Sequence, residues 1–136
     1  MREPLNAAIL GSPDRLEPWL NRLREGVLAV DTETTGLRWD RDRVGGLCLA
    51  AGDTAIYCYG DALGNAVRWL GDQVKAKRPL VFHNAKFDLH MLRGTFGLRV
   101  SYPVDDTMIM SFLIDNRGAP DVSGSAHKGH GLKNLA

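Results

Sequence analysis

The sequence predicts an α/β protein in which a mixed sheet is flanked by helices. Three strand-like segments follow one another between residues 27 and 59, and an amphipathic helix comes next. A short apolar strand at residues 79–82 then leads directly into another helix. Consecutive strands favour antiparallel neighbours, whereas a strand–helix–strand crossover favours parallel ones. We therefore expect the strands at residues 27–30 and 79–82 to be parallel, joined through the helix at 61–77.

The composition is that of a single globular domain over residues 1–136. Hydrophobic residues make up 44% of the chain and charged residues 24%, with a net charge of +1. Because there is no overall basic charge, nucleic-acid binding would need a local patch or metal ions. No apolar run approaches the length of a membrane span, and the start lacks a signal-peptide pattern, so we expect no membrane partner. Cys48 and Cys58 lie among apolar residues, which predicts buried, reduced thiols and supports neither a disulfide nor a metal site.

The first segment predicts an edge strand followed by a helix. Residues 7–10 are apolar, and Ser12 and Pro13 are typical of a helix start, with serine as the N-cap. Apolar side chains then recur at helical spacing, at Leu16, Trp19, Leu20 and Leu23. Pro18 interrupts this pattern, so that either the helix is kinked there or it begins at Pro18.

The next segment combines a buried strand with two acids. Residues 27–30 are apolar, and Asp31 and Glu33 follow two residues apart. In an extended chain such residues point to the same face, so both carboxylates project together. Mg²⁺ prefers oxygen ligands of this kind, and two such ions can stabilise phosphodiester hydrolysis. The alternative is a pair of solvated acids at a strand end, because a three-residue pattern is common by chance.

The middle of the chain predicts a hairpin, a helix and a strand. Residues 38–43 form a charged loop, and strands at 44–51 and 54–59 meet at a short turn. Two glycines, Gly45 and Gly46, indicate a bulge or a close backbone approach. The helix at 61–77 carries one apolar stripe, which predicts that it packs against the sheet.

A second polar group follows the strand at 79–82. Asn84 and Asp88 are four residues apart at the start of a helix that continues to Phe96, and so share one helical face. The alternative is structural, with Asn84 as the N-cap and Asp88 as a surface acid.

Near its C-terminus the chain predicts a strand at 100–104 and a helix at 108–114 with Asp106 as N-cap. That helix is apolar nearly all round, which predicts that it is buried. We therefore leave Asp105 and Asp106 out of a metal site. Residues 116–131 are rich in Gly, Ser and His and predict a mobile loop with solvated His127 and His130, and residues 131–136 look like the first turns of a helix.

Two stretches resemble motifs of a known family. The first resembles the first motif of the 3′→5′ exonucleases with four metal-binding acids, and the second, in the expected order, resembles their second motif. The two stretches are Asp31-Thr32-Glu33-Thr34-Thr35-Gly36-Leu37 and Asn84-Ala85-Lys86-Phe87-Asp88. The chain is most similar to the proofreading domain of family A DNA polymerase I. This resemblance implies a ribonuclease H-like fold, which is a mixed, twisted sheet with helices on both sides, and hydrolysis with two Mg²⁺ or Mn²⁺ ions.

The resemblance also implies roles for individual residues. Asp31 would contact both ions, Glu33 one ion and the terminal sugar, and Asp88 the second ion. Four further residues would surround the 3′-terminal nucleotides, namely Thr32, Leu37, Asn84 and Phe87. An aromatic and an apolar side chain suit single-stranded ends, because stacking binds them without reading sequence. The alternative for Leu37 and Phe87 is packing in the core.

The third motif of the family, a Tyr or His followed by an Asp on a late helix, has no convincing match. Tyr57 with Asp61 lies in a strand and turn, and Tyr102 is followed by Pro103, which disfavours a helix there. We therefore expect a domain truncated before that motif, lacking its C-terminal helices, and weak or inactive alone.

The expected partners are the 3′ end of single-stranded DNA, with RNA as an alternative, and a polymerase domain in a longer chain. The expected location is the cytoplasm of a bacterium or a phage-infected cell. Two other functions remain open at this point: an RNA exonuclease of the ribonuclease D type, and a catalytically dead domain that serves as a scaffold or binds nucleic acid.

Overall fold

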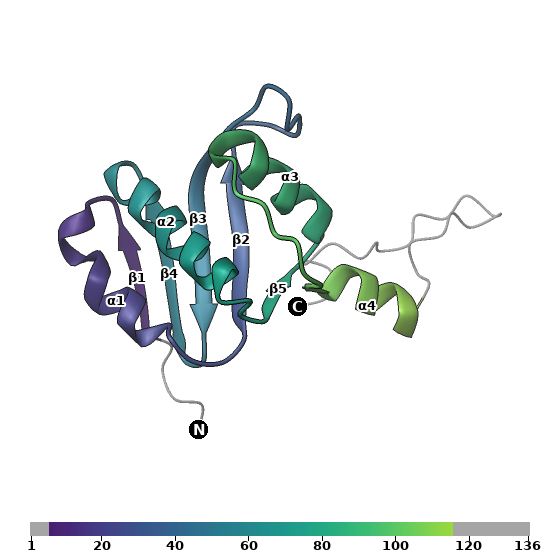
Figure 1. The fold of residues 1–136 in the computed structure, drawn as a ribbon, viewed down its shortest axis with the longest axis horizontal. Coiled ribbons are helices and arrows are strands. Elements are labelled where there is room, and N and C mark those ends of the chain that lie inside the picture. The colour runs from purple at the N-terminus through teal and green to yellow at the C-terminus, as the bar shows by residue number, and fades with distance from the viewer. Residues whose placement is uncertain (1–5, 116–136) are drawn as a thin grey trace.

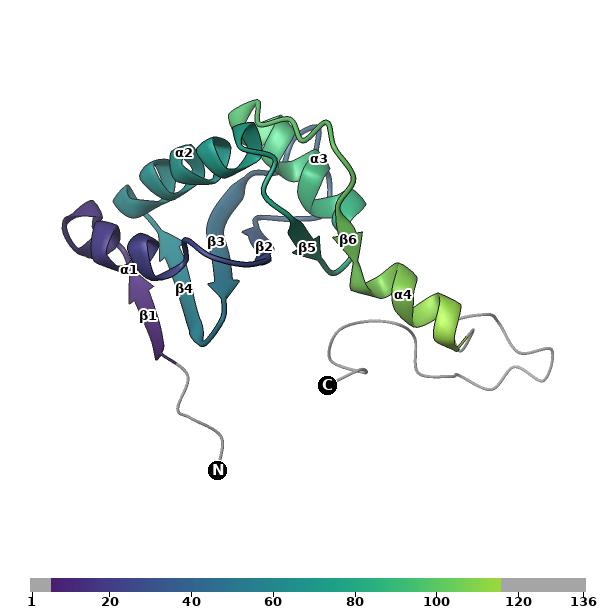
Figure 2. The same ribbon diagram turned by 60° about the horizontal axis from the view of Figure 1, so that its bottom comes forward.

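The computed structural model describes residues 6–115, which form one six-stranded sheet with helices (Figures 1 and 2). The strands lie in the order β1-β4-β3-β2-β5-β6. The elements are β1 (Asn6–Leu10), η1 (Pro13–Arg15), α1 (Leu16–Arg22), β2 (Leu28–Thr34), β3 (Val44–Ala51), β4 (Thr54–Tyr59), α2 (Asp61–Lys75), β5 (Leu80–Phe82), α3 (Ala85–Phe96), β6 (Asp105–Asp106) and α4 (Thr107–Ile114).

The sheet is mixed, as the sequence predicts. β2 pairs with β3, and β3 with β4, in antiparallel fashion. β5 lies parallel to β2, with Leu28 opposite Leu80, and α2 forms the crossover between β4 and β5. β1 is confirmed as an edge strand and pairs in parallel with β4. The register of β2 and β3 shifts between Glu33 and Thr34, which confirms the bulge predicted at the paired glycines.

The helices α1, α2 and α3 all lie on one face of the sheet, so within the described residues the helices expected on both sides cover one side only (Figure 2). We call this the closed face, and its strand residues are buried leucines, valines and isoleucines, among them Leu28, Val30, Leu47, Leu49 and Ile56. They form one core cluster with helix residues such as Leu20, Ala66 and Leu92. The period-2 alternation of the strands therefore directs the large apolar side chains towards the helices.

Alternate residues of the same strands point the other way. We call this the open face, and its residues include Ala29, Asp31, Cys48, Ala50 and Tyr57. They line a hollow of about 820 Å³ that runs across five strands. The side chains that line it are mostly small, which makes the surface concave.

Two expectations about regular structure are wrong. α1 begins at Leu16, so the helix does not start at Pro18. Proline is tolerated in a first turn because its missing N–H has no intrahelical acceptor there. Residues 100–104 form no strand, and β6 is only Asp105–Asp106. Val100 and Val104 pack against the core instead, and the Tyr102 hydroxyl donates a hydrogen bond to the Arg78 carbonyl (2.7 Å).

The expected burial of the apolar helix is also wrong. α4 has no buried residue, and Leu113 and Ile114 are 82% and 86% exposed. The helix continues from the edge strand β6 and extends away from the sheet (Figures 1 and 2). Apolar composition indicates that a helix needs a partner but does not place it against this sheet. The loop, His127, His130 and the terminal helix predicted beyond residue 115 lie outside the described residues. Within those residues, no helix is long and apolar enough to cross a membrane.

Candidate active site

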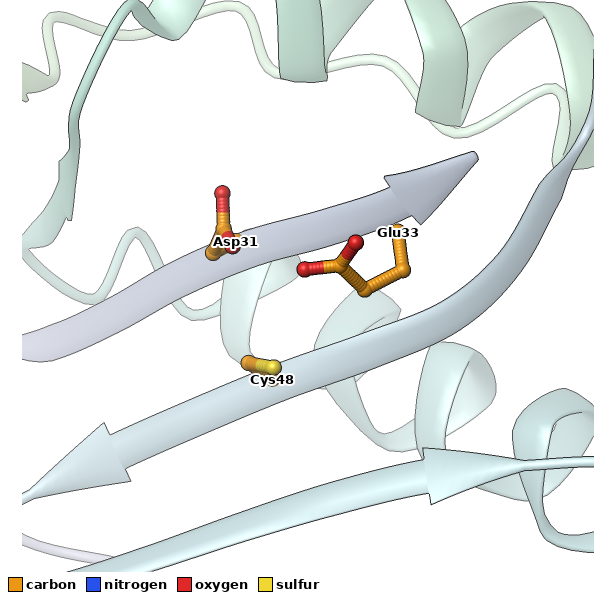
Figure 3. Close-up of side chains that lie close together, drawn as sticks. All are labelled: Asp31, Glu33 and Cys48. Atoms are coloured by element: carbon orange, nitrogen blue, oxygen red, sulfur yellow. The ribbon is translucent and has the colours of Figure 1, made fainter. Parts of the chain in front are cut away.

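The acid pair lies on the open face of β2. Asp31 and Glu33 are exposed and alternate with buried Val30 and Thr32, as expected of a strand with one covered face. Figure 3 shows the Glu33 side chain folded back so that its carboxylate points towards Asp31 and Cys48. One ligand atom of each of these three side chains lies within 4.8 Å of the other two. Within residues 6–115 this is the only such group of three possible metal ligands.

The electrostatics of the pair favour a cation. Partial burial raises the pKa of Asp31, and the negative charge of Glu33 raises it further. The Thr32 N–H group and His83 act in the opposite direction. A divalent ion between the carboxylates would offset their repulsion and supply the charge that burial disfavours. The donor set therefore fits the ion that the sequence predicts.

Asp88 lies next to the pair but on the covered side of β2. It is 2% exposed in the first turn of α3, and its carboxylate accepts hydrogen bonds from both the N–H group (3.2 Å) and the hydroxyl (2.5 Å) of Thr32. Burial raises the pKa of Asp88 to about 6 against the opposing effect of the Thr32 hydroxyl, and the charge of Asp31 adds to the rise. The structure thus brings Asp31 and Glu33 together and fixes Asp88 on the residue between them.

The start of α3 is held by an acid from another segment. The Asp106 carboxylate accepts hydrogen bonds from the N–H groups of Asn84 (3.0 Å), Ala85 (2.7 Å) and Met108 (2.9 Å). Burial acts to raise the pKa of Asp106, but the backbone hydrogen bonds outweigh it and hold the pKa below its usual range. Its predicted role as N-cap of α4 is confirmed, and it caps α3 as well.

Asn84 itself is not a side-chain cap. It occupies the N-cap position of α3, as the structural alternative predicts, but it has a left-handed backbone conformation (φ 67°) and makes no capping hydrogen bond through its side chain. Its exposed amide lies at the turn between β5 and α3. Left-handed conformations are tolerated better by asparagine than by most other residues, and here the turn directs Asp88 towards β2.

The other proposed substrate contacts differ in their surroundings. Leu37 is 84% exposed, which excludes core packing for this residue. Phe87 is partly buried and is not part of the core cluster. Thr32 is buried against Asp88. Contact of these residues and Asn84 with a nucleotide stays a prediction, as does metal ligation by the three acids.

Cys48 is the residue near the acids that sequence reasoning missed. It is partly rather than fully buried, and it lies opposite Asp31 in the pairing of β2 with β3. Burial raises the pKa of its thiol to about 11, and the charges of Asp31 and Glu33 contribute. The hairpin register would have revealed it, but the register depends on the bulge near Gly45. Cys58 is buried, as predicted.

The chain is similar to exonuclease domains of DNA polymerases. Residues 8–136 match a family model described as 3′-5′ exonuclease. DNA polymerase I of Chloroflexus aurantiacus is 31% identical over 144 residues, which covers 98% of this chain and 14% of that protein. DNA polymerase DpoZ of Acinetobacter phage SH-Ab 15497 is 39% identical over 92 residues, or 65% of this chain and 14% of that protein. The chain thus spans about a seventh of the length of these polymerases.

Solved structures show the same fold. NrnC of Brucella melitensis with bound Mg²⁺ is 29% identical, with a TM-score of 0.69 over 96% of this chain and 59% of that chain. RNase D of Escherichia coli is 20% identical, with a TM-score of 0.62 over 78% of this chain and 28% of that chain. At this identity the likeness supports the ribonuclease H-like fold alone. The order of strands, the acid pair on β2 and the match over residues 8–136 agree: the chain belongs to the 3′-5′ exonuclease family.

Proposed function

We propose that this chain is a metal-dependent 3′-5′ exonuclease domain of the proofreading type that acts on the 3′ end of single-stranded DNA. One observation carries the proposal: the carboxylates of Asp31 and Glu33 converge on the open face of β2, and Asp88 is hydrogen-bonded to Thr32, the residue between them. These are the acids to which the motif resemblance assigns metal binding.

The three acids differ in exposure, and we assign them different roles in metal binding. Asp31 and Glu33 are exposed and oriented to hold Mg²⁺ or Mn²⁺, and Asp88 completes the set for a second ion from the neighbouring helix. When bound, such ions lower the pKa of water and stabilise the charge that develops on the phosphate. Thr32 keeps Asp88 in place through two hydrogen bonds, and Asp88 would exchange one of them for an ion.

The 3′ end of the substrate would contact residues that lie near the acids in the sequence. Leu37 offers an exposed apolar side chain on the loop after β2, and Phe87 offers an aromatic ring one residue before Asp88. Apolar and aromatic contacts of this kind bind unpaired bases with little preference for sequence. Asn84 adds an exposed amide, and Thr32 acts in this proposal through Asp88.

The relatives support a biological setting for this proposal. The matching polymerases come from phages and a bacterium, so we place the domain beside a polymerase domain, in the cytoplasm of a bacterium or a phage-infected cell. Three of the family's four acids are assigned here. We therefore expect the isolated chain to bind Mn²⁺ weakly and to degrade DNA slowly.

The test is a single-turnover assay with the chain in excess over a 5′-labelled single-stranded oligonucleotide and Mn²⁺. We expect slow shortening from the 3′ end that Asp31→Asn abolishes. Asp72→Asn, which removes an exposed acid on α2, is the matched control and should leave the rate unchanged. Identical rates for the wild type and Asp31→Asn, together with identical Mn²⁺ affinity, would mean that the domain is a scaffold rather than a nuclease.

One observation favours RNA as a second candidate substrate. Structures of NrnC bound to pGG and of RNase D, described as an exoribonuclease, share this fold. The same assay with RNA and DNA oligonucleotides of matched sequence separates the two. Faster degradation of RNA would replace the proofreading proposal with one of RNA turnover.

A further inference from the structure

A sulfur atom lies beside the two carboxylates that we assign to metal binding. Cys48 is the register partner of Asp31 on β3, and residues directly opposite one another on neighbouring strands project from the same face. Its Sγ atom, one Asp31 oxygen and one Glu33 oxygen all lie within 4.8 Å of one another (Figure 3). The sulfur is therefore part of the same ligand group as the acids.

Tyr57 of β4 borders the group formed by Asp31, Glu33 and Cys48. Gly46 lies opposite Glu33, and a methyl group at Gly46 would overlap the ring of Tyr57. The Tyr57 ring therefore covers the backbone of β3 next to the sulfur. Glu33 folds back towards Asp31 and Cys48, so its carboxylate points towards both of these side chains (Figure 3).

We propose that Cys48 is a third protein ligand to a divalent ion held by Asp31 and Glu33, and that it makes this site select Zn²⁺ over Mg²⁺. The inference rests on the proposed function, because it assumes an ion at the acid pair. One cysteine and two carboxylates match the three protein ligands of an open zinc site, which leaves a fourth position for water or substrate. Ligands around a tetrahedral zinc ion lie roughly 3.5 Å apart, so the three side chains need to approach one another by only about 1 Å.

The chemistry separates the two ions. Mg²⁺ prefers oxygen ligands and retains several waters, so it uses the carboxylates and leaves the thiol protonated. Zn²⁺ binds thiolate sulfur strongly, and the Cys48 proton passes to solvent as the metal–sulfur bond forms, with no change of oxidation state. Zinc would consequently compete with Mg²⁺ for Asp31 and Glu33 and inhibit the reaction assigned to them.

The experiment uses Cd²⁺ as a spectroscopic substitute for Zn²⁺, because cadmium–thiolate bonds give an ultraviolet charge-transfer band. The full chain is titrated with Cd²⁺ in excess Mg²⁺. We expect the band in the wild type and its loss in Cys48→Ser, with Cd²⁺ affinity at least about tenfold lower. Cys58→Ala is the matched control, since Cys58 is fully buried and should leave the band unchanged. Circular dichroism verifies that each variant is folded.

Mn²⁺ titrations of the same proteins separate this inference from the proposed function. Cys48→Ser should retain Mn²⁺ binding, and Asp31→Asn should lose both Mn²⁺ binding and the cadmium band. Mn²⁺ binding that depends on Asp31, without a thiolate band in the wild type, overturns the inference and leaves the proposed function standing. A band that survives Asp31→Asn and Glu33→Gln overturns it too, because the sulfur then binds independently of the acids. A band that depends on Asp31, without Mn²⁺ binding, supports the cysteine site and overturns the proposed function.

Discussion

Leu49 and Ala50 are neighbours on β3 that point to opposite faces of the sheet. Leu49 is 1% exposed within the core cluster beneath the helices, and Ala50 lines the hollow of the open face. Asp31 and Val30 show the same division on β2, one beside the other acids and one in the core. The closed face buries most of the apolar side chains and is therefore expected to contribute most of the stability, whereas the open face carries charges that oppose folding.

The largest effect should come from shortening a closed-face side chain. Leu49→Ala removes buried apolar atoms and leaves a cavity, so we expect the free energy of unfolding to fall by about 2–5 kcal/mol. Ala50→Ser on the open face should change it by no more than about 0.5 kcal/mol. Denaturant unfolding measures both. Equal losses for the two variants would contradict the division between the faces.

Asp88 is the acid on the closed face and should make stability depend on pH. Its pKa is about 6 in the folded chain, against an ordinary value near 4, so the folded chain holds its proton over a range where the unfolded chain has lost it. The stability that this bound proton adds to the folded chain is therefore complete below about pH 4 and is lost as pH rises through about 6. The free energy of unfolding should fall by up to about 3 kcal/mol over this range.

Urea unfolding between pH 4 and 7, without divalent ions, measures this dependence. Asp31 should contribute in the same direction, because its pKa is also raised. Asp88→Asn should flatten most of the profile. An unchanged slope in that variant would show that other groups cause it.

Two glycines in the helices that cover the closed face, Gly94 and Gly64, differ in how closely other atoms approach them. A Cβ atom at Gly94 of α3 would lie 2.7 Å from the Trp39 carbonyl oxygen, whereas nothing lies within 4 Å of one at Gly64 of α2. We expect Gly94→Ala to lower the free energy of unfolding by about 1–3 kcal/mol. Gly64→Ala should raise it by about 0.5–1 kcal/mol, because alanine favours helix. Thermal unfolding of both variants tests the prediction, and a stabilising Gly94→Ala would show that the loop yields without cost.

An open-face acid should affect metal binding far more than it affects stability. Asp31→Asn removes repulsion with Glu33, so the free energy of unfolding should stay within about 1 kcal/mol of the wild type or rise slightly. Mn²⁺ affinity, measured by calorimetry, should nevertheless fall at least about tenfold. A large loss of stability in the metal-free variant would mean that Asp31 supports the fold.

The sequence could predict this division but not all of its detail. Alternation along β2 was enough to place Asp31 and Glu33 together, and spacing was enough to place Asp88 at the start of α3. The hydrogen bonds from Thr32 to Asp88 could not be predicted, because they depend on how α3 packs against β2. Cys48 was missed for a similar reason, since its position opposite Asp31 follows from pairing between two strands.

Local sequence patterns fail to predict the surroundings of α4 and of residues 100–104. α4 was expected to be buried because nearly every residue in it is apolar, but composition does not specify a partner surface. Residues 100–104 resemble a strand, yet Tyr102 is held by a hydrogen bond to Arg78 and its neighbours pack against the core. In both cases tertiary contacts, and not propensity, decided the outcome.

The Asp106 carboxylate has a mechanical consequence. It accepts hydrogen bonds from N–H groups at the starts of two helices, Ala85 of α3 and Met108 of α4, which are more than twenty residues apart in the chain. The starts of α3 and α4 are therefore fixed to one another by a single side chain, and Asp88 lies only three residues beyond Ala85 in the first turn of α3. Loss of the Asp106 carboxylate would leave N–H groups at both helix starts without this acceptor.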